Sequence, residues 1–294
     1  MAAPSFQGLR YEPDFAPVQG VRRSLALMYH EVIAHAFCDP KGAPPKGTDL
    51  YKLSEREFTA HVTAIGAAVS NPPLRRADRA ETWREERPFF LTFDDGEDSA
   101  YTIVADLLEA RGWIGHFFVV TDLIGRPRFL SAAQIRELDR RGHVIGSHTC
   151  SHPIPISQCS PEQVRREWSQ SVRILSDITG RSVLTGSVPG GYYSRPVAEA
   201  AVEAGIRFLF TSEPRVGVSR VGDCLVLGRY AMRRGTDPAT AAAFAGGRIG
   251  PRWRQAIIWN AKKVIKRANA QAYVRARHVL LGSRAGTATA PPRP

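Results

Sequence analysis

The chain has 294 residues, of which 43% are hydrophobic, 23% charged and 9% aromatic. This composition is ordinary for a soluble globular protein, and it excludes a disordered, collagen-like or disulfide-scaffold chain. At roughly 150 residues per domain, the length predicts one large domain or two small ones. No apolar stretch reaches the ~18 residues that span a bilayer, and residues 1–30 lack the apolar core of a secretory signal. We therefore expect a cytoplasmic chain.

The positive charge is concentrated toward the C-terminal end. The net charge is +12, from 40 Lys and Arg against 28 Asp and Glu. Residues 238–294 hold eleven of the basic residues and no acidic one, so the rest of the chain is close to neutral. Charge and composition predict four parts: an N-terminal extension (1–20), a main domain (21–237), a basic helical tail (238–282) and a disordered end (283–294).

The basic tail contains a predicted amphipathic helix. Lys and Arg project from one side, and apolar residues recur at helical spacing on the other, namely Trp253, Ile257, Ala261, Val264 and Ala268. Such a helix either packs its apolar side on the domain or lies on an anionic membrane surface through residues 250–280. Sequence alone favours neither. Nucleic acid is not an expected partner, because no base-reading module or aromatic stacking pattern accompanies the charge.

Short apolar segments alternate with helical patterns from residue 25 to about residue 245, which predicts an α/β fold with a parallel sheet. The predicted strands are 25–29, 89–93, 115–120, 143–147, 183–188, 206–211 and 224–227. Seven such strands suit a barrel-like sheet. Ser54 with Glu57, Ser131 with Gln134 and Ser160 with Gln163 have the spacing of capping boxes, which mark helix starts.

Two adjacent carboxylates follow the predicted strand 89–93. Asp94, Asp95 and Gly96 stand at the carboxyl end of the strand, where α/β folds place their active sites. Neighbouring side chains at a strand end diverge, so one carboxylate can bind a metal ion while the other accepts a proton. The plainer alternative is a strand-to-helix turn, with Asp as the cap and Gly for backbone freedom.

Two histidines follow the predicted strand 143–147. His148 and His152 are four residues apart, so on a helical turn they face the same way and can share one metal ion. One carboxylate and two imidazoles make three ligands and leave positions open for water and substrate, as in catalytic metal sites. A lone histidine pair is more often surface or core, but two motifs at neighbouring strand ends favour a site.

With these motifs the sequence resembles the polysaccharide deacetylases, the NodB homology domain of carbohydrate esterase family 4. Residues 92–96 match the family's TFDDG motif, and residues 148–152 match its HS/TxxH motif. The resemblance covers about residues 20–230 and implies a distorted (β/α)7-type barrel with a catalytic domain over 21–237. It also implies that Asp94 is the catalytic base and that Asp95, His148 and His152 bind a divalent metal ion, with Zn²⁺ as the first expectation.

Two further motifs depart from the family pattern. The RxPxG motif falls on residues 187–191, where Ser187 stands in place of the arginine that steadies the base. Pro189, Gly191 and Tyr192 fit a loop whose backbone approaches the substrate oxyanion. The late LxH motif falls on residues 227–229, where Arg229 replaces the histidine that acts as general acid. Arginine does not release a proton near neutral pH.

His30 offers a substitute for the missing acid. Residues 27–31 resemble the early Tyr-His segment of the poly-N-acetylglucosamine deacetylase branch, whose motif order is circularly permuted. In that branch the early histidine takes the acid role and the RxPxG arginine is commonly absent, so the two departures explain each other. The alternative is a buried histidine that hydrogen-bonds to a backbone carbonyl.

The sequence therefore predicts a metal-dependent hydrolase that removes N-acetyl groups from an amino sugar in a glycan, glycolipid or glycoside precursor. Asp94 takes a proton from water, a backbone N–H near Gly191 or Tyr192 holds the oxyanion, and His30 protonates the amine. Alternatives are an O-deacetylase, a small-molecule amide hydrolase, or a catalytically silent carbohydrate-binding or membrane-associated scaffold. For a cytoplasmic chain, we expect a nucleotide-linked sugar, a glycoside or a lipid-linked glycan at the inner membrane face as substrate.

Overall fold

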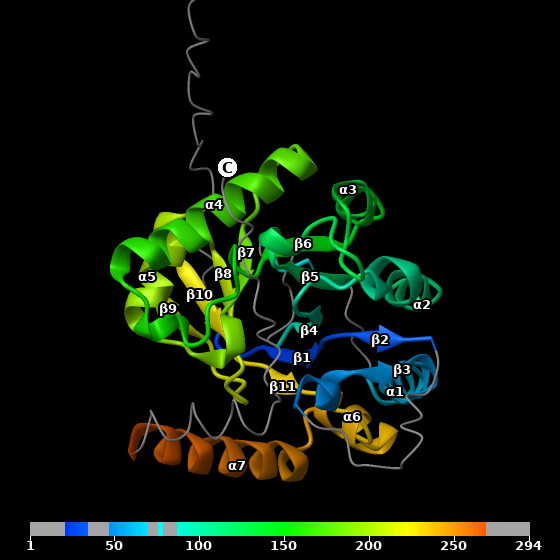
Figure 1. The fold of residues 1–294 in the computed structure, drawn as a ribbon. Coiled ribbons are helices and arrows are strands. Elements are labelled where there is room, and N and C mark those ends of the chain that lie inside the picture. The colour runs from blue at the N-terminus through cyan, green and yellow to red at the C-terminus, as the bar shows by residue number, and fades with distance from the viewer. Residues whose placement is uncertain (1–20, 35–46, 70–75, 79–86, 269–294) are drawn as a thin grey trace, which may run out of the picture.

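The computed structural model describes residues 21–34, 47–69, 76–78 and 87–268. The predicted extension 1–20 and the predicted end 283–294 lie outside these residues. Nine strands form one curled sheet in the order β11-β1-β4-β5-β6-β7-β8-β10-β9 (Figure 1). Neighbouring strands run parallel, except that β9 is antiparallel to β10.

The strands of this sheet are β1 (Leu25–Tyr29), β4 (Phe89–Phe93), β5 (Gly115–Val119), β6 (Val144–Ser147), β7 (Thr185–Ser187), β8 (Phe208–Phe210), β9 (Ser219–Val221), β10 (Cys224–Leu227) and β11 (Tyr230–Ala231). A second, small sheet pairs β2 (Val32–Ile33) with β3 (Leu53–Ser54). All seven predicted strands are confirmed, and in the sheet they follow one another in chain order. The very short strands β2, β3, β9 and β11 were not predicted, because so few residues carry no periodic signal.

The sheet curls because one short link joins its opposite ends. Only Gly228 and Arg229 separate β10, which pairs with β8, from β11, which pairs with β1. The Cα atoms of Leu227 and Tyr230 are three steps apart along the chain and so at most about 11 Å from each other, which keeps the two ends of the sheet close together. A Cβ at Gly228 would lie 2.5 Å from the carbonyl oxygens of Glu213 and Arg215, so only glycine fits this link. The predicted barrel-like architecture is confirmed, with a link rather than a hydrogen-bonded pair closing the ring.

Helices surround this sheet (Figure 1). The α-helices are α1 (Glu55–Ala68), α2 (Ala105–Glu109), α3 (Ala132–Arg140), α4 (Pro161–Thr179), α5 (Arg195–Glu203), α6 (Pro238–Ala245) and α7 (Ile249–Ala268). Short single turns are η1 (Gly47–Tyr51), η3 (Ala100–Val104), η4 (Thr121–Leu123), η5 (Ile156–Gln158) and η6 (Pro189–Gly191). Two of the three predicted capping boxes are complete, at the starts of α1 and α3. At the start of α4 the Ser160 hydroxyl accepts a bond from the Gln163 backbone N–H, but the return bond from the Ser160 backbone N–H to the Gln163 side chain is not formed.

The hydrophobic core continues beyond the main domain predicted from charge. Ala241, Phe244 and Ala245 of α6 belong to the same buried cluster as β1, β4 and α1. The Phe244 ring lies 5.0 Å from the Tyr230 ring of β11. Helix α6 is therefore part of the packed body, because it covers the edge of the sheet where β11 ends.

Helix α7 turns its apolar side away from the body. The exposed fraction is 67% for Ile249, 66% for Trp253 and 60% for Ile257. On the inner side, Gln255 exchanges two hydrogen bonds of 3.0 Å with the backbone of Ala231, and Arg252 donates to the Tyr230 hydroxyl. The polar side thus anchors α7, and packing of the Trp253 face on the domain is not seen. No helix in the described part of the chain is long and apolar enough to cross a membrane.

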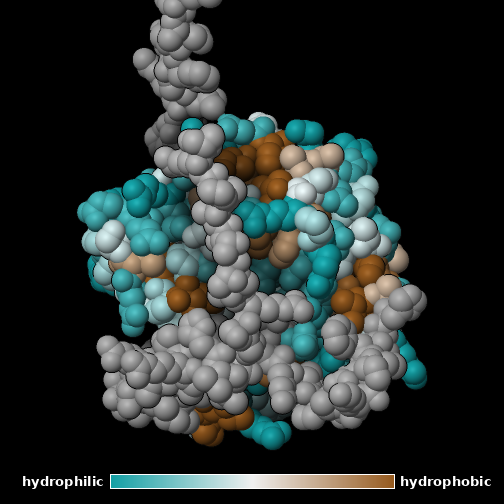
Figure 2. All heavy atoms as spheres, viewed as in Figure 1, coloured by the Kyte–Doolittle hydropathy of each residue, from teal (hydrophilic) through white to brown (hydrophobic). Residues whose placement is uncertain are grey.

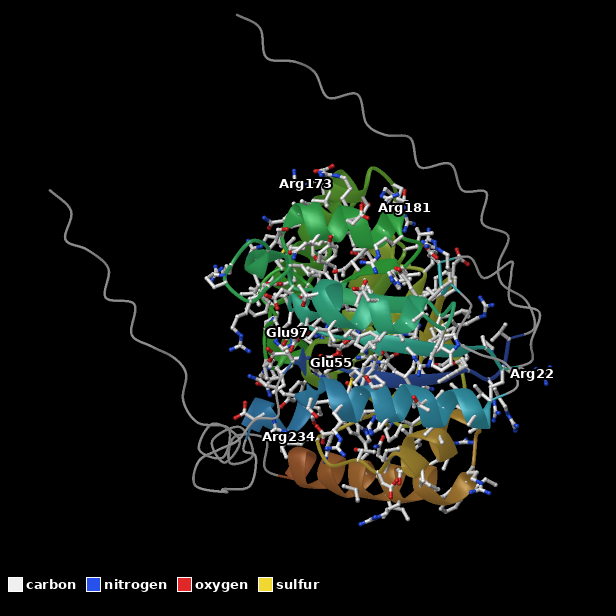
Figure 3. All side chains as sticks on the ribbon, turned by 90° about the vertical axis from the view of Figure 1, so that its right-hand side faces the viewer. Arg22, Glu55, Glu97, Arg173, Arg181 and Arg234 are labelled. Atoms are coloured by element: carbon white, nitrogen blue, oxygen red, sulfur yellow. The ribbon has the colours of Figure 1, made fainter. Side chains whose placement is uncertain are left out.

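The parallel strands bring their carboxyl ends to one end of the sheet. Figure 3 shows Glu97, which follows β4, and Arg234, which follows β11, at this end of the molecule. Arg22, which precedes β1, lies at the opposite end. The segments after β1, β4, β6, β7 and β10 therefore meet at one place, and these segments contain every predicted site residue.

Candidate active site

The turn after β4 separates the two adjacent carboxylates. Asp94 is buried and its backbone N–H donates to the Tyr29 carbonyl, which extends the ladder with β1 by one residue. Asp95 then adopts a left-handed conformation with φ of 74°, and Gly96 follows with φ of 81°. After this reversal both carboxylates line the pocket, and the side chain of Asp95 is 31% exposed whereas that of Asp94 is 4% exposed. The two neighbouring carboxylates thus differ in exposure, and their separate roles remain a prediction.

The segment after β6 presents the two histidines. Nδ1 of His148 bonds to the carbonyl of Ser187 at 2.8 Å, which leaves Nε2 free to face Asp95. Thr149 and His152 have positive φ values of 65° and 57°, which side-chain-bearing residues adopt only under constraint. The ring centres of His148 and His152 lie 4.8 Å apart.

Glu167 of α4 supplies part of that constraint. Its carboxylate accepts hydrogen bonds from the backbone N–H groups of Cys150 and Ser151, both at 2.9 Å. The Ser151 hydroxyl donates to the same carboxylate at 2.6 Å. A buried carboxylate with three donors fixes the loop between the two histidines, so both imidazoles are held ready on one side.

Asp95, His148 and His152 have the geometry of a metal site. Oδ1 of Asp95 lies 3.4 Å from Nε2 of His148 and 3.6 Å from Nε2 of His152. Ligands at the 2.0–2.1 Å typical of zinc, set at a tetrahedral angle, are about 3.3 Å apart, so these spacings need little adjustment. The three donor atoms all lie within 4.8 Å of one another. One carboxylate and two imidazoles suit zinc and similar divalent ions.

The electrostatics of this cluster also favour a cation. Burial lowers the pKa of His152 to about 4, with a further contribution from His148, so its imidazole is neutral and able to bind a metal. Burial alone would lower the pKa of His148, but Asp94 and Asp95 raise it above its usual value. The carboxylates of Asp94 and Asp95 thus create a negative electrostatic potential at His148. A proton or a metal ion bound at His148 would offset this negative charge.

Arg229 pairs with Asp94 inside the barrel. The guanidinium donates to both carboxylate oxygens, at 2.6 and 2.7 Å, and its side chain is completely buried. Nη2 of Arg229 also donates to the Ser187 hydroxyl at 2.7 Å, and that hydroxyl donates to Asp94 at 3.3 Å. Burial would raise the pKa of Asp94, but Arg229 and then His148 lower it below its usual range. Asp94 is therefore an anion held in one orientation by a bidentate partner.

His30 lies beside this cluster, on the link after β1. It lines the same pocket as Asp94, Asp95 and His148, and its Nδ1 is buried with no hydrogen-bond partner among the described residues. A buried histidine with a purely structural role was expected to hydrogen-bond to a backbone carbonyl. Nδ1 of His30 makes no such bond to the described residues. Burial lowers the pKa of His30, whereas the charges of Asp95 and Asp94 raise it. The His30 ring packs on Tyr51 with centres 4.7 Å apart.

The turn at Pro189–Gly191 forms a further wall of the pocket. Gly190 faces the pocket, with φ of 58°. The backbone N–H groups of Gly191 and Tyr192 donate to the carbonyls of Val188 and Pro189 at 3.3 and 3.2 Å. A Cβ at Gly191 would lie 2.9 Å from the Trp259 ring, so α7 rests directly on this turn. The oxyanion role of these residues remains a prediction.

These walls enclose a cavity of about 570 Å³. Asp95, His148, His152 and His30 line this cavity together with residues of α6 and α7. This volume suits one or two sugar residues or a ligand of comparable size. The candidate metal ligands thus lie in the wall of a pocket that α6 and α7 help to form.

Comparison with known proteins agrees with this architecture. Residues 83–209 match the profile of the polysaccharide deacetylase family. The chain is 27% identical over 192 residues to YxkH of Bacillus subtilis, named as a polysaccharide deacetylase, with 64% of each protein covered. It is 28% identical over 160 residues to the peptidoglycan-N-acetylglucosamine deacetylase PgdA of Listeria monocytogenes, covering 54% of this chain and 32% of PgdA. The chain therefore spans less than two thirds of these relatives.

Solved structures share the fold. The Streptococcus pyogenes deacetylase PplD superposes with a TM-score of 0.60 and 19% identity, over 74% of this chain and 95% of PplD. IcaB from Ammonifex degensii superposes with a TM-score of 0.61 and 22% identity, over 76% of this chain and 97% of IcaB. The comparisons thus support a polysaccharide deacetylase of the NodB type (carbohydrate esterase family 4), with the family profile matching residues 83–209 and the solved structures sharing the fold.

Sequence reasoning located Asp94, Asp95, His148, His152 and His30 but missed their supports. Arg229 was interpreted only as a lost histidine, although it is the partner of Asp94. The signal was available, because arginine is missing from the position of Ser187 and present at position 229 in the same pattern. Glu167 and Tyr51 had no such signal, since their roles depend on which segments pack together.

We predict that replacing Arg229 alone destabilises the protein much more than replacing Arg229 and Asp94 together. Arg229→Met leaves Asp94 buried without a counter-charge, so we expect a loss of about 3–5 kcal/mol in the free energy of unfolding at pH 7. In this variant the folded-state pKa of Asp94 rises, so the loss shrinks as the pH falls and Asp94 becomes protonated. The double variant Arg229→Met/Asp94→Asn should recover much of the loss.

Urea unfolding of the three proteins between pH 5 and pH 8 measures this effect. An equal destabilisation by Arg229→Met across that range, with no recovery in the double variant, would contradict the interpretation of the pair as a charge interaction.

Proposed function

We propose that this protein is a metal-dependent deacetylase that removes N-acetyl groups from an amino sugar of a glycan or glycan precursor. The observation that carries the proposal is the meeting of Asp94, Asp95, His30, His148 and His152 in the wall of a single pocket. Similarity to a family whose relatives include a peptidoglycan-N-acetylglucosamine deacetylase supports an acetylated sugar as the substrate.

The proposed cofactor is Zn²⁺, bound by Asp95, His148 and His152. When bound, such an ion polarises a carbonyl group and lowers the pKa of water toward neutrality. The 2.8 Å bond between Nδ1 of His148 and the Ser187 carbonyl fixes that imidazole for ligation through Nε2.

Asp94 is the proposed general base. It is anionic, and its Oδ2 lies 3.9 Å from Nε2 of His148, so it stands next to the metal ligands without being one of them. Its bidentate bonds to Arg229 leave further lone pairs of the carboxylate for a water molecule. Arg229 thus orients the base, in the place of the arginine that Ser187 replaces.

His30 is the proposed general acid. Burial lowers the pKa of His30 below its usual value, although Asp95 and Asp94 oppose this shift, so His30 must take up a proton before it can act as the acid. Protonated His30 would then donate to the departing amine, with the oxyanion placed beside Gly190, which lines the pocket. An O-deacetylase would use the same base and metal but would depend less on the acid, because an alkoxide leaves more readily than an amine anion.

We predict that acetate release from an N-acetylglucosamine oligomer depends on the metal and on both proton-transfer residues. Asp95→Ala and treatment with a chelator should each abolish metal content and activity together. Asp94→Asn should keep the metal and lower kcat by about 10²–10⁴, and His30→Ala should lower it similarly. Metal analysis and an enzyme-coupled acetate assay give the two readouts.

His143→Gln serves as the control, because His143 precedes β6 and lies outside the pocket, where its ring bonds to the Gly115 backbone N–H and to Glu109. Full activity after complete metal removal would contradict the proposal. Unchanged activity of His30→Ala on the N-acetyl substrate would return His30 to a structural role.

We also propose that the protein works at the surface of an anionic membrane, peripheral on the inner face, with α7 as the contact. The exposed Ile249, Trp253 and Ile257 lie on one side of α7, and we call them the α7 ridge. Figure 2 shows hydrophobic surface at the lower edge of the molecule, where Figure 1 places α7. Burying such a ridge in the headgroup region removes apolar area from water, and Trp favours that interface.

The positive charge of α7 supports an anionic bilayer surface as the binding partner of the α7 ridge. The sequence of α7 contains six Lys and Arg and no Asp or Glu. Each basic residue near an anionic surface contributes about 1 kcal/mol to binding. Because Trp259 and Ile258 of the same helix line the pocket, a membrane-bound α7 would hold the pocket beside the lipid headgroups.

Vesicle sedimentation tests this proposal with the full chain. We expect binding to vesicles that contain phosphatidylglycerol, and much weaker binding to phosphatidylcholine alone or in 1 M salt. Trp253→Ser/Ile257→Ser should lower the partition coefficient at least about tenfold, because two apolar side chains lose their burial. Ile154→Ser is the matched control, since it removes an exposed isoleucine outside α7.

Absence of binding to anionic vesicles would contradict the membrane proposal. A dimer in light scattering that dissociates in the Trp253→Ser/Ile257→Ser variant would instead assign the α7 ridge to a second copy of the chain.

A further inference from the structure

Part of the pocket lining is not used by the deacetylation chemistry. Arg233 from the segment after β11 and Arg254 from α7 both line the pocket. Apolar side chains of α6 and α7 line it as well, namely Phe244, Pro251, Ile258 and Trp259. The pocket thus combines the candidate metal ligands with basic and apolar side chains.

These two guanidinium groups of the pocket lining have no acidic partners among the described residues. Neither Arg233 nor Arg254 forms an ion pair with a carboxylate of the described residues. Nε of Arg233 is buried and has no hydrogen-bond partner there. Of the other acidic residues on the pocket, Glu31 is engaged by Lys52 and Arg128, and burial together with Asp95 raises the pKa of Glu97 well above its usual value. Two guanidinium groups without acidic partners on one pocket favour an anion there.

Tyr51 limits how far Arg233 can lie from the proposed acid. The guanidinium carbon of Arg233 lies 5.5 Å from the centre of the Tyr51 ring, and the His30 ring lies 4.7 Å from the same centre. Arg233 and His30 thus contact the same ring and lie within about 10 Å of each other. In a 2-acetamido sugar, the substituent on the anomeric carbon is separated from the acetamido nitrogen by two ring carbons. An anionic group on the anomeric carbon can thus reach Arg233 while the acetyl group lies beside the candidate metal ligands.

We infer that Arg233 and Arg254 bind a phosphate ester on the anomeric carbon of the sugar that is deacetylated, a substrate class that rests on the proposed function. Guanidinium forks match phosphate oxygens, and two forks suit a phosphate or diphosphate better than a single carboxylate. The apolar side chains of the pocket would contact the second substituent of the phosphate. Both a lipid chain and a nucleobase can make such apolar contacts, and the experiments below distinguish these two substituents.

Calorimetry on the zinc-loaded Asp94→Asn variant tests the site without turnover. N-acetylglucosamine 1-phosphate should bind at least about tenfold more tightly than methyl N-acetylglucosaminide. Arg233→Met in the same background should remove this preference. Arg234→Met, which alters the neighbouring arginine outside the pocket, should keep it. Equal affinity for the two sugars, or equal affinity for N-acetylmuramic acid and the 1-phosphate, would overturn the inference.

Acetate release by the wild-type protein separates the two sources of phosphate. We would measure kcat/KM for uridine diphosphate N-acetylglucosamine and for N-acetylglucosamine linked to a short prenyl diphosphate. Each value is divided by kcat/KM for methyl N-acetylglucosaminide. A ratio of at least about ten for either one supports the inference and identifies the source. Ratios at or below one for both would overturn it. Phosphate-selective binding without acetate release from any substrate would contradict the proposed deacetylase and leave the phosphate site standing.

Discussion

The ion pair between Arg229 and Asp94 is the interaction on which this site depends. A carboxylate buried inside a barrel is stable as an anion only with a paired charge, and Arg229 supplies it through two bonds of 2.6 and 2.7 Å. The pair is possible because the link between β10 and β11 crosses the sheet opening and carries Arg229 inward. The same link brings the two ends of the sheet together. Fold closure and orientation of the base therefore share one short segment.

The arrangement also explains how Ser187 can replace an arginine of the family motif. Ser187 is small enough to leave room for the Arg229 guanidinium, from which it accepts a bond of 2.7 Å. Its backbone carbonyl meanwhile bonds to Nδ1 of His148. Ser187 thus contacts the proposed base Asp94, its partner Arg229 and the proposed metal ligand His148. In the family motif the arginine stands at the end of β7, whereas in this chain it stands on the β10–β11 link and still pairs with Asp94.

The sequence predicted what depends on local pattern. The seven strands, the capping boxes and the residues Asp94, Asp95, His148 and His152 all follow from short motifs with known spacing. The partner of Asp94, the support from Glu167 and the place of Tyr51 depend on contacts between distant segments, and no periodicity encodes them. The orientation of α7 was also open, because an amphipathic helix can present either face to the body, and here Gln255 and Arg252 anchor the polar one.

We propose that Asp95, His148 and His152 hold a metal ion while Asp94 stays paired with Arg229 and acts as the base. A crystal structure of the zinc-loaded protein, with the zinc located by anomalous scattering, tests this proposal directly. We expect one zinc peak about 2.0–2.2 Å from the three ligands, with both Arg229–Asp94 bonds retained. A zinc ion coordinated by Asp94, or no zinc among these three residues at saturating metal, would contradict it.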